Sequence, residues 1–112
     1  MRVLVVEDQY VIAEDIGQNL AAVGCQIVGL APSVPDAIQL IDDNPGLNLA
    51  VLDVNLAGEP VFDLVDLLGS RQVRCVFATG CDKAAIPSRY AHIPRVDKPI
   101  ELHRLTAALE RA

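Results

Sequence analysis

The sequence predicts an α/β fold in which a doubly wound, five-stranded parallel sheet has the strand order 2-1-3-4-5. Three observations lead to this prediction: unbroken apolar blocks, segments with helical spacing between those blocks, and helix-ending residues at the joints. The chain has 112 residues, of which 52% are hydrophobic and 21% charged, a balance that excludes disorder and low complexity. We therefore expect a single domain over residues 1–112.

Apolar blocks predict the three central strands of the sheet. They are Val3–Val6, Leu49–Leu52 and Cys75–Ala78. Each block is unbroken rather than alternating, which is typical of parallel strands whose two faces are both covered. Two weaker strands are expected at about residues 26–30 and 92–97, and Pro94 in the second of them indicates an edge position. The order 2-1-3-4-5 places both weak strands at the edges of the sheet.

Apolar residues with helical spacing separate the strands, at about residues 12–23, 34–41, 61–68 and 102–109. Gly24 just past the first helix is typical of a helix end, and Ser33 three residues before Asp36 predicts an N-cap for the second. A further helix between residues 82 and 90 is expected to be short or frayed, because Pro87 would break a helix that begins at Ala84.

Composition excludes several functional classes. The chain has 15 Asp and Glu against 9 Lys and Arg, and its formal charge of -6 disfavours nucleic acids and anionic membranes as partners. Glu7 and Asp8 interrupt any signal peptide, and no apolar run approaches the roughly 20 residues of a membrane span. Cys25, Cys75 and Cys81 lack CxxC spacing, which favours reduced thiols. We expect a cytoplasmic protein.

Polar residues follow four of the predicted strands at their carboxyl ends. They are Glu7, Asp8, Asp53, Thr79 and Lys98. Each has an ordinary explanation when taken singly, such as an acidic helix start or a surface charge, but their joint occurrence along one edge favours a ligand site. Two carboxylates 4 Å apart repel by about 4 kcal/mol at an effective dielectric near 20, so cations must neutralise the cluster. Lys98 offsets one negative charge. For the rest, Mg²⁺ is favoured over Ca²⁺, because a site with only a few carboxylates has room for the water ligands that Mg²⁺ retains.

These residues resemble a known family, the receiver domain of two-component response regulators. The resemblance covers essentially the whole chain through the segments VLVVEDQ, AVLDVNL, VFATGC and VDKPIE, in the family's order and approximate spacing. It implies the flavodoxin-like (βα)5 receiver fold, with a cis peptide bond between Lys98 and Pro99. It also implies that Asp53 is the phosphoacceptor and that Thr79 and Lys98 hold phosphoryl oxygens. The ligands it implies for Mg²⁺ are Glu7, Asp8, Asp53 and the backbone carbonyl of Asn55.

The resemblance implies a single-domain response regulator. Such a protein takes a phosphoryl group from a sensor histidine kinase or a phosphotransfer protein in a Mg²⁺-dependent reaction and later hydrolyses it. It signals to a downstream protein target through a changed surface, as a monomer or weak homodimer, and is a switch rather than a metabolic enzyme. The Phe77–Gly80 segment is similar to receivers served by HWE-type kinases. Asn55 and Cys81 would flank the site and tune dephosphorylation.

Two features depart from the family pattern. Arg95 stands three residues before the lysine, where receivers usually carry an aromatic residue that couples to the threonine. The loop after the phosphoacceptor reads Leu56-Ala57-Gly58 without the family's proline, and we expect it to be looser. Arg95, Arg104 and Arg111 are interpreted as solvated charges.

Two other functions stay open at this point. One is a degenerate receiver that binds partners without phosphorylation, against which the intact set from Glu7 to Lys98 argues. The other is a small phosphohydrolase with an aspartate nucleophile. That enzyme would need a second acid two residues after Asp53, where Asn55 stands, and a substrate cap.

Overall fold

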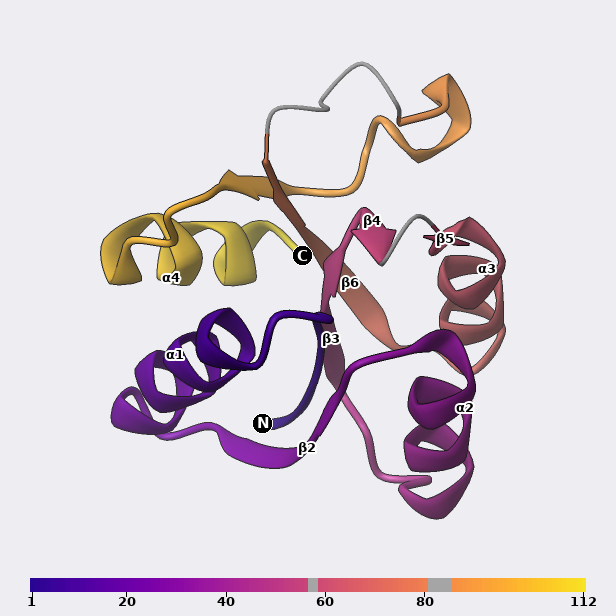
Figure 1. The fold of residues 1–112 in the computed structure, drawn as a ribbon, viewed down its shortest axis with the longest axis horizontal. Helices are drawn as coiled ribbons and strands as arrows, with labels where there is room; N and C mark the ends of the chain where they lie inside the picture. Colours follow the sequence, from indigo (N-terminus) through magenta and orange to yellow (C-terminus); the bar gives the residue numbers. More distant parts are fainter. Residues whose placement is uncertain (57–58, 81–85) are drawn as a thin grey trace.

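The computed structural model describes residues 1–56, 59–80 and 86–112 and confirms the predicted α/β architecture (Figure 1). One parallel sheet has the order β2-β1-β3-β6-β7, which is the predicted order 2-1-3-4-5. Its strands are β1 (Arg2–Val6), β2 (Gln26–Ala31), β3 (Leu49–Asp53), β6 (Arg74–Thr79) and β7 (Arg95–Asp97). A separate antiparallel pair joins the short strands β4 (Asn55–Leu56) and β5 (Glu59–Pro60), which the sequence did not predict.

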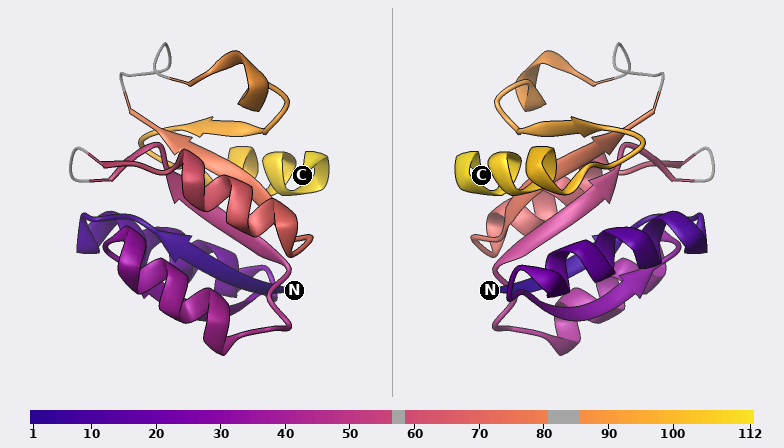
Figure 2. Two further views of the ribbon diagram at one scale, coloured as in Figure 1. Left: turned by 90° about the vertical axis from the view of Figure 1, so that its right-hand side faces the viewer. Right: turned by 90° about the vertical axis from the view of Figure 1, so that its left-hand side faces the viewer.

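Helices cover both faces of the sheet. In the described residues they are α1 (Tyr10–Ala22), α2 (Val34–Asp43), α3 (Phe62–Ser70), α4 (Leu102–Arg111) and the 3-10 turn η2 (Ser88–Tyr90). Helices α1 and α4 lie on one face of the sheet, and α2 and α3 lie on the other (Figures 1 and 2). None of the helices in these ranges is long and apolar enough to cross a membrane.

The core explains why the central strands are unbroken apolar blocks. Val3 and Val5 of β1 pack into the cluster that contains residues of α1 and α4, whereas Leu4 and Val6 pack into the cluster beneath α2 and α3. Because successive residues of a strand point to opposite faces, a strand covered on both sides must be apolar at every position. Both the odd-numbered and the even-numbered positions of β1 therefore need apolar residues, and polar residues follow only after the strand ends.

Two elements differ from the sequence expectation. Strand β7 begins at Arg95 rather than at residue 92, because Pro94 has no N–H to donate to a ladder; its carbonyl oxygen still accepts a hydrogen bond from Phe77 N at 2.9 Å. The helix expected between residues 82 and 90 falls partly on residues 81–85, which lie outside the described residues. The described remainder of that segment contains only the short turn η2.

The start of α2 depends on the predicted cap. Ser33 Oγ accepts a hydrogen bond from the backbone N–H of Asp36 at 3.3 Å and donates one to its carboxylate at 2.8 Å. We expect Ser33→Ala to lower the free energy of unfolding by about 1 kcal/mol, because a helix N–H loses its acceptor. Urea denaturation followed by circular dichroism measures this change. The control is Ser70→Ala, which removes a hydroxyl from the exposed last turn of α3 and should cost less than about 0.5 kcal/mol. Equal losses in the two variants would contradict the capping role.

Candidate functional site

Three carboxylates meet at the carboxyl ends of adjacent strands. Glu7 and Asp8 directly follow β1, and Asp53 is the last residue of β3. The two strands are hydrogen-bonded neighbours whose last paired residues are Val6 and Leu52. As a result, one carboxylate oxygen of each acid lies within 4.8 Å of those of the other two. Glu7 and Asp53 are buried and Asp8 is half-buried, so the cluster opens to solvent on the Asp8 side.

Lys98 brings one positive charge into this cluster from the end of β7. Its ammonium contacts Glu7 Oε1 directly and lies 3.3 Å from Asp53 Oδ2. The backbone N–H of Lys98 donates to the carbonyl oxygen of Thr79 at 2.7 Å, which continues the pairing of β6 with β7 up to the site. The peptide bond between Lys98 and Pro99 is cis. One ammonium therefore faces three acids.

The electrostatics of the cluster reflect this imbalance. Burial raises the pKa of Glu7 to about 7, and the charge of Asp53 adds to that rise, although the hydrogen bond from Lys98 opposes it. For Lys98, burial lowers the pKa, but the hydrogen bond with Glu7 and the charge of Asp53 outweigh burial and the pKa is raised. Lys98 consequently stays cationic, but its single positive charge does not balance the three acids.

The donor set fits a hard divalent cation. Glu7, Asp8 and Asp53 offer only oxygen atoms, which are the ligands that Mg²⁺ and Ca²⁺ prefer. Mg²⁺ keeps several waters and commonly uses one or two carboxylates, which suits a cluster with one half-buried member. A second positive charge beside Lys98 would also favour the ionised form of Glu7, whose pKa is raised mainly by burial and further by the charge of Asp53. The residues are thus compatible with the expected magnesium site.

Two other predicted site residues, Asn55 and Thr79, line a cavity beside Asp53 and Lys98. A cavity of about 170 Å³ is lined by Asp53, Val54, Asn55, Thr79, Gly80 and Lys98. The backbone N–H of Asn55 donates to Asp53 Oδ1 at 3.3 Å, while the side chain of Asn55 is exposed. Thr79 is buried, and its hydroxyl donates to Asp97 Oδ1 at 3.0 Å. Cys81, which the sequence placed at this rim, lies outside the described residues.

A second opening lies beside the site, on the side of α1. A hollow of about 720 Å³ is bordered by Val11, Ile12 and Asp15 of α1 and by residues 97–100, which include Lys98. Tyr10 and Val11 are 69% and 79% exposed. Sequence reasoning missed this surface because Val11 falls within an apolar stretch that resembles the buried stripe of α1. Val11 and Ile12 make this side of the hollow an apolar rim next to the acid cluster, and exposed apolar surface of this kind is typical of contact areas for macromolecules.

An aromatic cluster that the sequence did not predict holds η2 against α3. The ring of Tyr90 stacks on Phe62 with centroids 5.0 Å apart, and its hydroxyl donates to Asp66 Oδ1 at 2.8 Å. The guanidinium of Arg89 lies over the same ring at 4.6 Å. Arg95, which occupies the position of the family's usual aromatic residue, instead lies opposite Phe77 in the pairing of β6 with β7. Tyr90 and Phe77 are both buried aromatic residues of this region.

Comparisons with known proteins give consistent results for the fold. No protein-family model matches the chain, and no curated protein does. Among solved structures, SdrG from Sphingomonas melonis Fr1 is 31% identical, with a TM-score of 0.89 over 99% of this chain and 94% of that one. The BeF3-activated conformation of SdrG from Pseudomonas melonis Fr1 is 32% identical, with a TM-score of 0.82 over 98% of this chain and 93% of that one. A CheY-like response regulator receiver domain from Methylobacillus flagellatus is 23% identical, with a TM-score of 0.85 and coverage of 98% and 96%, and supports the fold alone.

Proposed function

Because this chain belongs to the receiver domains of response regulators, we propose that Asp53 accepts a phosphoryl group in a Mg²⁺-dependent reaction. The donor in this proposal is the phosphohistidine of a sensor histidine kinase, of the HWE type by its Phe77–Gly80 segment, or of a phosphotransfer protein. The observation that carries the proposal is the meeting of Glu7, Asp8 and Asp53 around one point with Lys98 beside Asp53. The chain then signals to a protein target through its changed surface.

The chemistry requires little beyond placement and charge. An oxygen of the Asp53 carboxylate attacks phosphorus, the bond from phosphorus to the histidine nitrogen breaks, and the leaving imidazole takes a proton from solvent. A carboxylate already carries the negative charge of a nucleophile, so no general base is needed. Lys98, at 3.3 Å from Asp53 Oδ2, offsets negative charge on the transferred group. When bound by Glu7, Asp8 and Asp53, Mg²⁺ would neutralise further charge on the phosphoryl oxygens.

The hollow beside α1 supports a macromolecular donor. A phosphohistidine on a partner protein must reach Asp53 from solvent, and the 720 Å³ hollow lies next to Lys98. Val11 lines this hollow, and with its neighbour Tyr10 it presents exposed surface that a partner would cover. A small metabolite would not need this rim. We therefore favour transfer from a protein donor over the hydrolysis of small phosphate esters.

Mass measurement separates the three functions considered from the sequence. Incubation with a small acyl-phosphate donor, with and without Mg²⁺, is expected to add one phosphoryl group to the protein only when the metal is present. No mass gain under either condition would favour a phosphorylation-independent binding module. Steady consumption of the donor without any covalent adduct would favour a phosphohydrolase.

The hydrogen bond from Thr79 to Asp97 supports a switching step within this proposal. Thr79 Oγ1 donates to Asp97 Oδ1, and Thr79 is only 2% exposed, so its hydroxyl needs a partner inside the protein. A phosphoryl group on Asp53 would offer that hydroxyl a charged acceptor across the 170 Å³ hollow that both residues line. Phosphorylation would then exchange one partner of Thr79 for another and move the end of β6 relative to β7.

Removing the resting partner should therefore favour the phosphorylated form. We expect Asp97→Ala to raise the ratio of phosphorylated to unphosphorylated protein at steady state about fivefold, because one hydrogen bond contributes about 1 kcal/mol to the resting form alone. Intact-mass analysis measures the ratio. The matched control is Asp97→Asn, which keeps an acceptor oxygen for Thr79. In a Thr79→Val background the effect of Asp97→Ala should vanish, and its persistence there would refute the exchange.

A further inference from the structure

The segment that follows Asp53 forms a strand pair. The sequence, which lacks the family's proline here, predicted a looser loop, but β4 pairs antiparallel with β5. The pairing matches Asn55 with Pro60 and Leu56 with Glu59. Residues 57 and 58, between the two strands, lie outside the described residues. The backbone directly after Asp53 and Val54 is therefore held by strand pairing.

Buried side chains on both sides of Asn55 anchor this strand pair. Val54 and Leu56 are 5% and 2% exposed, and both belong to the core cluster beneath α2 and α3. The side chain of Asn55 is exposed and lies on the opposite side, as alternate residues of a strand do. Leu56 thus ties β4 to the core, while Asn55 borders the cavity that Asp53 also lines.

The backbone of Asn55 faces the acid cluster. Its N–H donates to Asp53 Oδ1 at 3.3 Å, so this edge of β4 faces Asp53 and not β5. In a β-strand the N–H and the carbonyl oxygen of one residue point to the same side. Pro60, which stands opposite Asn55, has no N–H to donate to that oxygen. The carbonyl oxygen of Asn55 is therefore directed toward the side of Asp53.

From these observations we infer that Leu56, through the strand pair β4–β5, is a positioning residue of the magnesium site. It holds the carbonyl oxygen of Asn55 beside the carboxylates of the acid cluster. The resemblance implied this carbonyl as a ligand, but no pattern in the sequence predicted its anchor. This role depends on the proposed function, since it concerns the same cation.

The anchor matters because of charge and entropy. A carbonyl oxygen adds a ligand without adding negative charge, which suits a cluster whose three acids already exceed the charge of Lys98. A carbonyl on a free loop would have to be ordered when the cation binds, and that ordering weakens binding. Leu56, which is buried in the core, fixes the adjoining peptide in advance. Loss of this anchor should weaken cation binding although every ligand atom remains.

Carbonyl resonances report directly on Asn55. Labelling with carbonyl-13C asparagine and 15N leucine leaves three cross-peaks in an HNCO spectrum, because only Asn19, Asn48 and Asn55 precede a leucine. We expect MgCl₂ to shift the Asn55 peak with the midpoint that calorimetric titration gives for the same protein. The Asn19 and Asn48 peaks, which report on the end of α1 and the residue before β3, should stay in place.

Two outcomes of this titration contradict the role of Leu56 in different ways. If calorimetry shows that Mg²⁺ binds while the Asn55 peak does not move, the positioning role is overturned and the proposed function stands. If neither calorimetry nor any peak detects Mg²⁺, the positioning role and the proposed function both fail.

Leu56→Ala tests the anchor. We expect it to weaken Mg²⁺ binding about tenfold in calorimetric titration, because removing the support behind a ligand typically costs this much. Leu56→Met keeps the volume of the side chain and should bind Mg²⁺ within about twofold of the original protein. Leu56→Val removes less of the side chain and should give an intermediate loss, which keeps the test open if Leu56→Ala does not fold.

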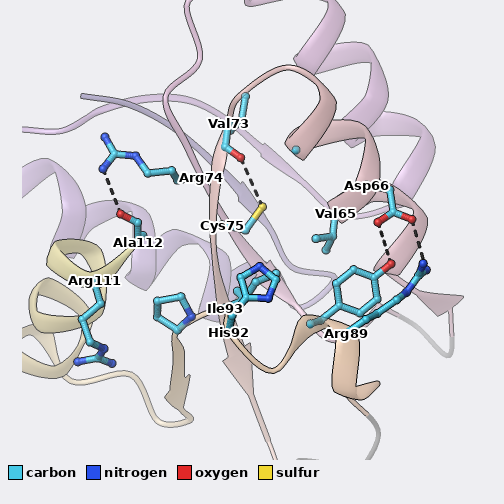
Figure 3. A pocket seen from close by; sticks show the side chains of 13 residues that line it. Val65, Asp66, Val73, Arg74, Cys75, Arg89, His92, Ile93, Arg111 and Ala112 are labelled. Carbon is cyan, nitrogen blue, oxygen red and sulfur yellow. Dashed lines mark hydrogen bonds and ion pairs between the residues drawn. The ribbon is translucent and has the colours of Figure 1, made fainter.

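The matched control is Leu68→Ala. Leu68 is 0% exposed in the same core cluster, but it lies near the other end of α3, where its carbonyl oxygen accepts from Val73 N–H at 2.9 Å. Val73 and Cys75 border a hollow of about 490 Å³ at that end, drawn in Figure 3, and no residue of the acid cluster lines it. Leu68→Ala should lower Tm about as much as Leu56→Ala, since both empty a buried leucine site.

Mg²⁺ affinity separates positioning from stability. Leu68→Ala should change it less than about twofold, because distant sites act independently. Equal weakening of Mg²⁺ binding in Leu68→Ala and Leu56→Ala would attribute the effect to general destabilisation and overturn the positioning role. Undiminished binding in a folded Leu56→Ala protein, or in Leu56→Val where Leu56→Ala does not fold, would overturn it as well.

Discussion

Asp53→Asn is expected to abolish the covalent phosphoryl adduct completely. An asparagine amide has nearly the shape of the aspartate but is not a nucleophile toward phosphorus, so the mass gain seen in the original protein with an acyl-phosphate donor and Mg²⁺ should disappear. The variant keeps one oxygen that can accept the hydrogen bond from the Asn55 N–H. It also removes one of three neighbouring acids, so the fold should lose little stability.

Intact-mass analysis over a time course measures this result. The matched control is Asp63→Asn, which changes an exposed acid in the first turn of α3 and should leave the mass gain unaltered. Chelation of Mg²⁺ should reproduce the Asp53→Asn result in the original protein. An adduct that persists in Asp53→Asn would place the phosphoacceptor elsewhere and refute the proposed function.

Lys98→Met is expected to produce the largest loss of stability at the site. The side chain of Lys98 is 18% exposed, and that of Glu7, its direct partner, is 1% exposed. Breaking a buried ion pair by removing one partner costs about 3–5 kcal/mol, and we expect about 3 kcal/mol here because Glu7 can respond by taking up a proton. Mg²⁺ should restore part of this loss, since it supplies positive charge to the same three carboxylates.

Urea unfolding in chelator and in saturating MgCl₂ measures both effects. Lys98→Arg is the matched control, because it keeps the positive charge and should lose less than half as much stability as Lys98→Met. If the two variants are equally destabilised, shape rather than charge explains the role of Lys98. A loss in Lys98→Met that Mg²⁺ does not reduce at all would contradict a cation site formed by Glu7, Asp8 and Asp53.

Several elements of the fold were predictable because they depend on local pattern. The blocks at Val3–Val6 and Leu49–Leu52 are apolar at every position, and only a strand covered on both faces requires this. The cap at Ser33 and the positive φ of 93° at Gly24 were predictable for the same reason, since a cap and a helix end involve residues close in the chain. Strand β7 was overestimated because the apolar residues around Pro94 resemble a longer strand.

Part of the candidate site was also predictable from the sequence, and part was not. Parallel strands bring their carboxyl ends to one edge, so the positions of Glu7, Asp53 and Lys98 along the chain were enough to place them together. The partner of the Thr79 hydroxyl was not predictable, because the choice of Asp97 depends on how the ends of β6 and β7 lie. Likewise, no pattern in the sequence shows that Tyr90 stacks on Phe62, because the two residues are 28 positions apart in the chain.

The sequence by itself determined the class of fold, the order of the strands and the set of polar residues at one edge of the sheet, because periodicity and the geometry of parallel strands are properties of short segments. Only the tertiary structure decided which acids share Lys98, which partner Thr79 takes, and that Tyr90 stacks on Phe62. The physical reason is that these contacts join residues far apart in the chain. Their geometry is set by the packing of side chains between elements, which no local pattern specifies.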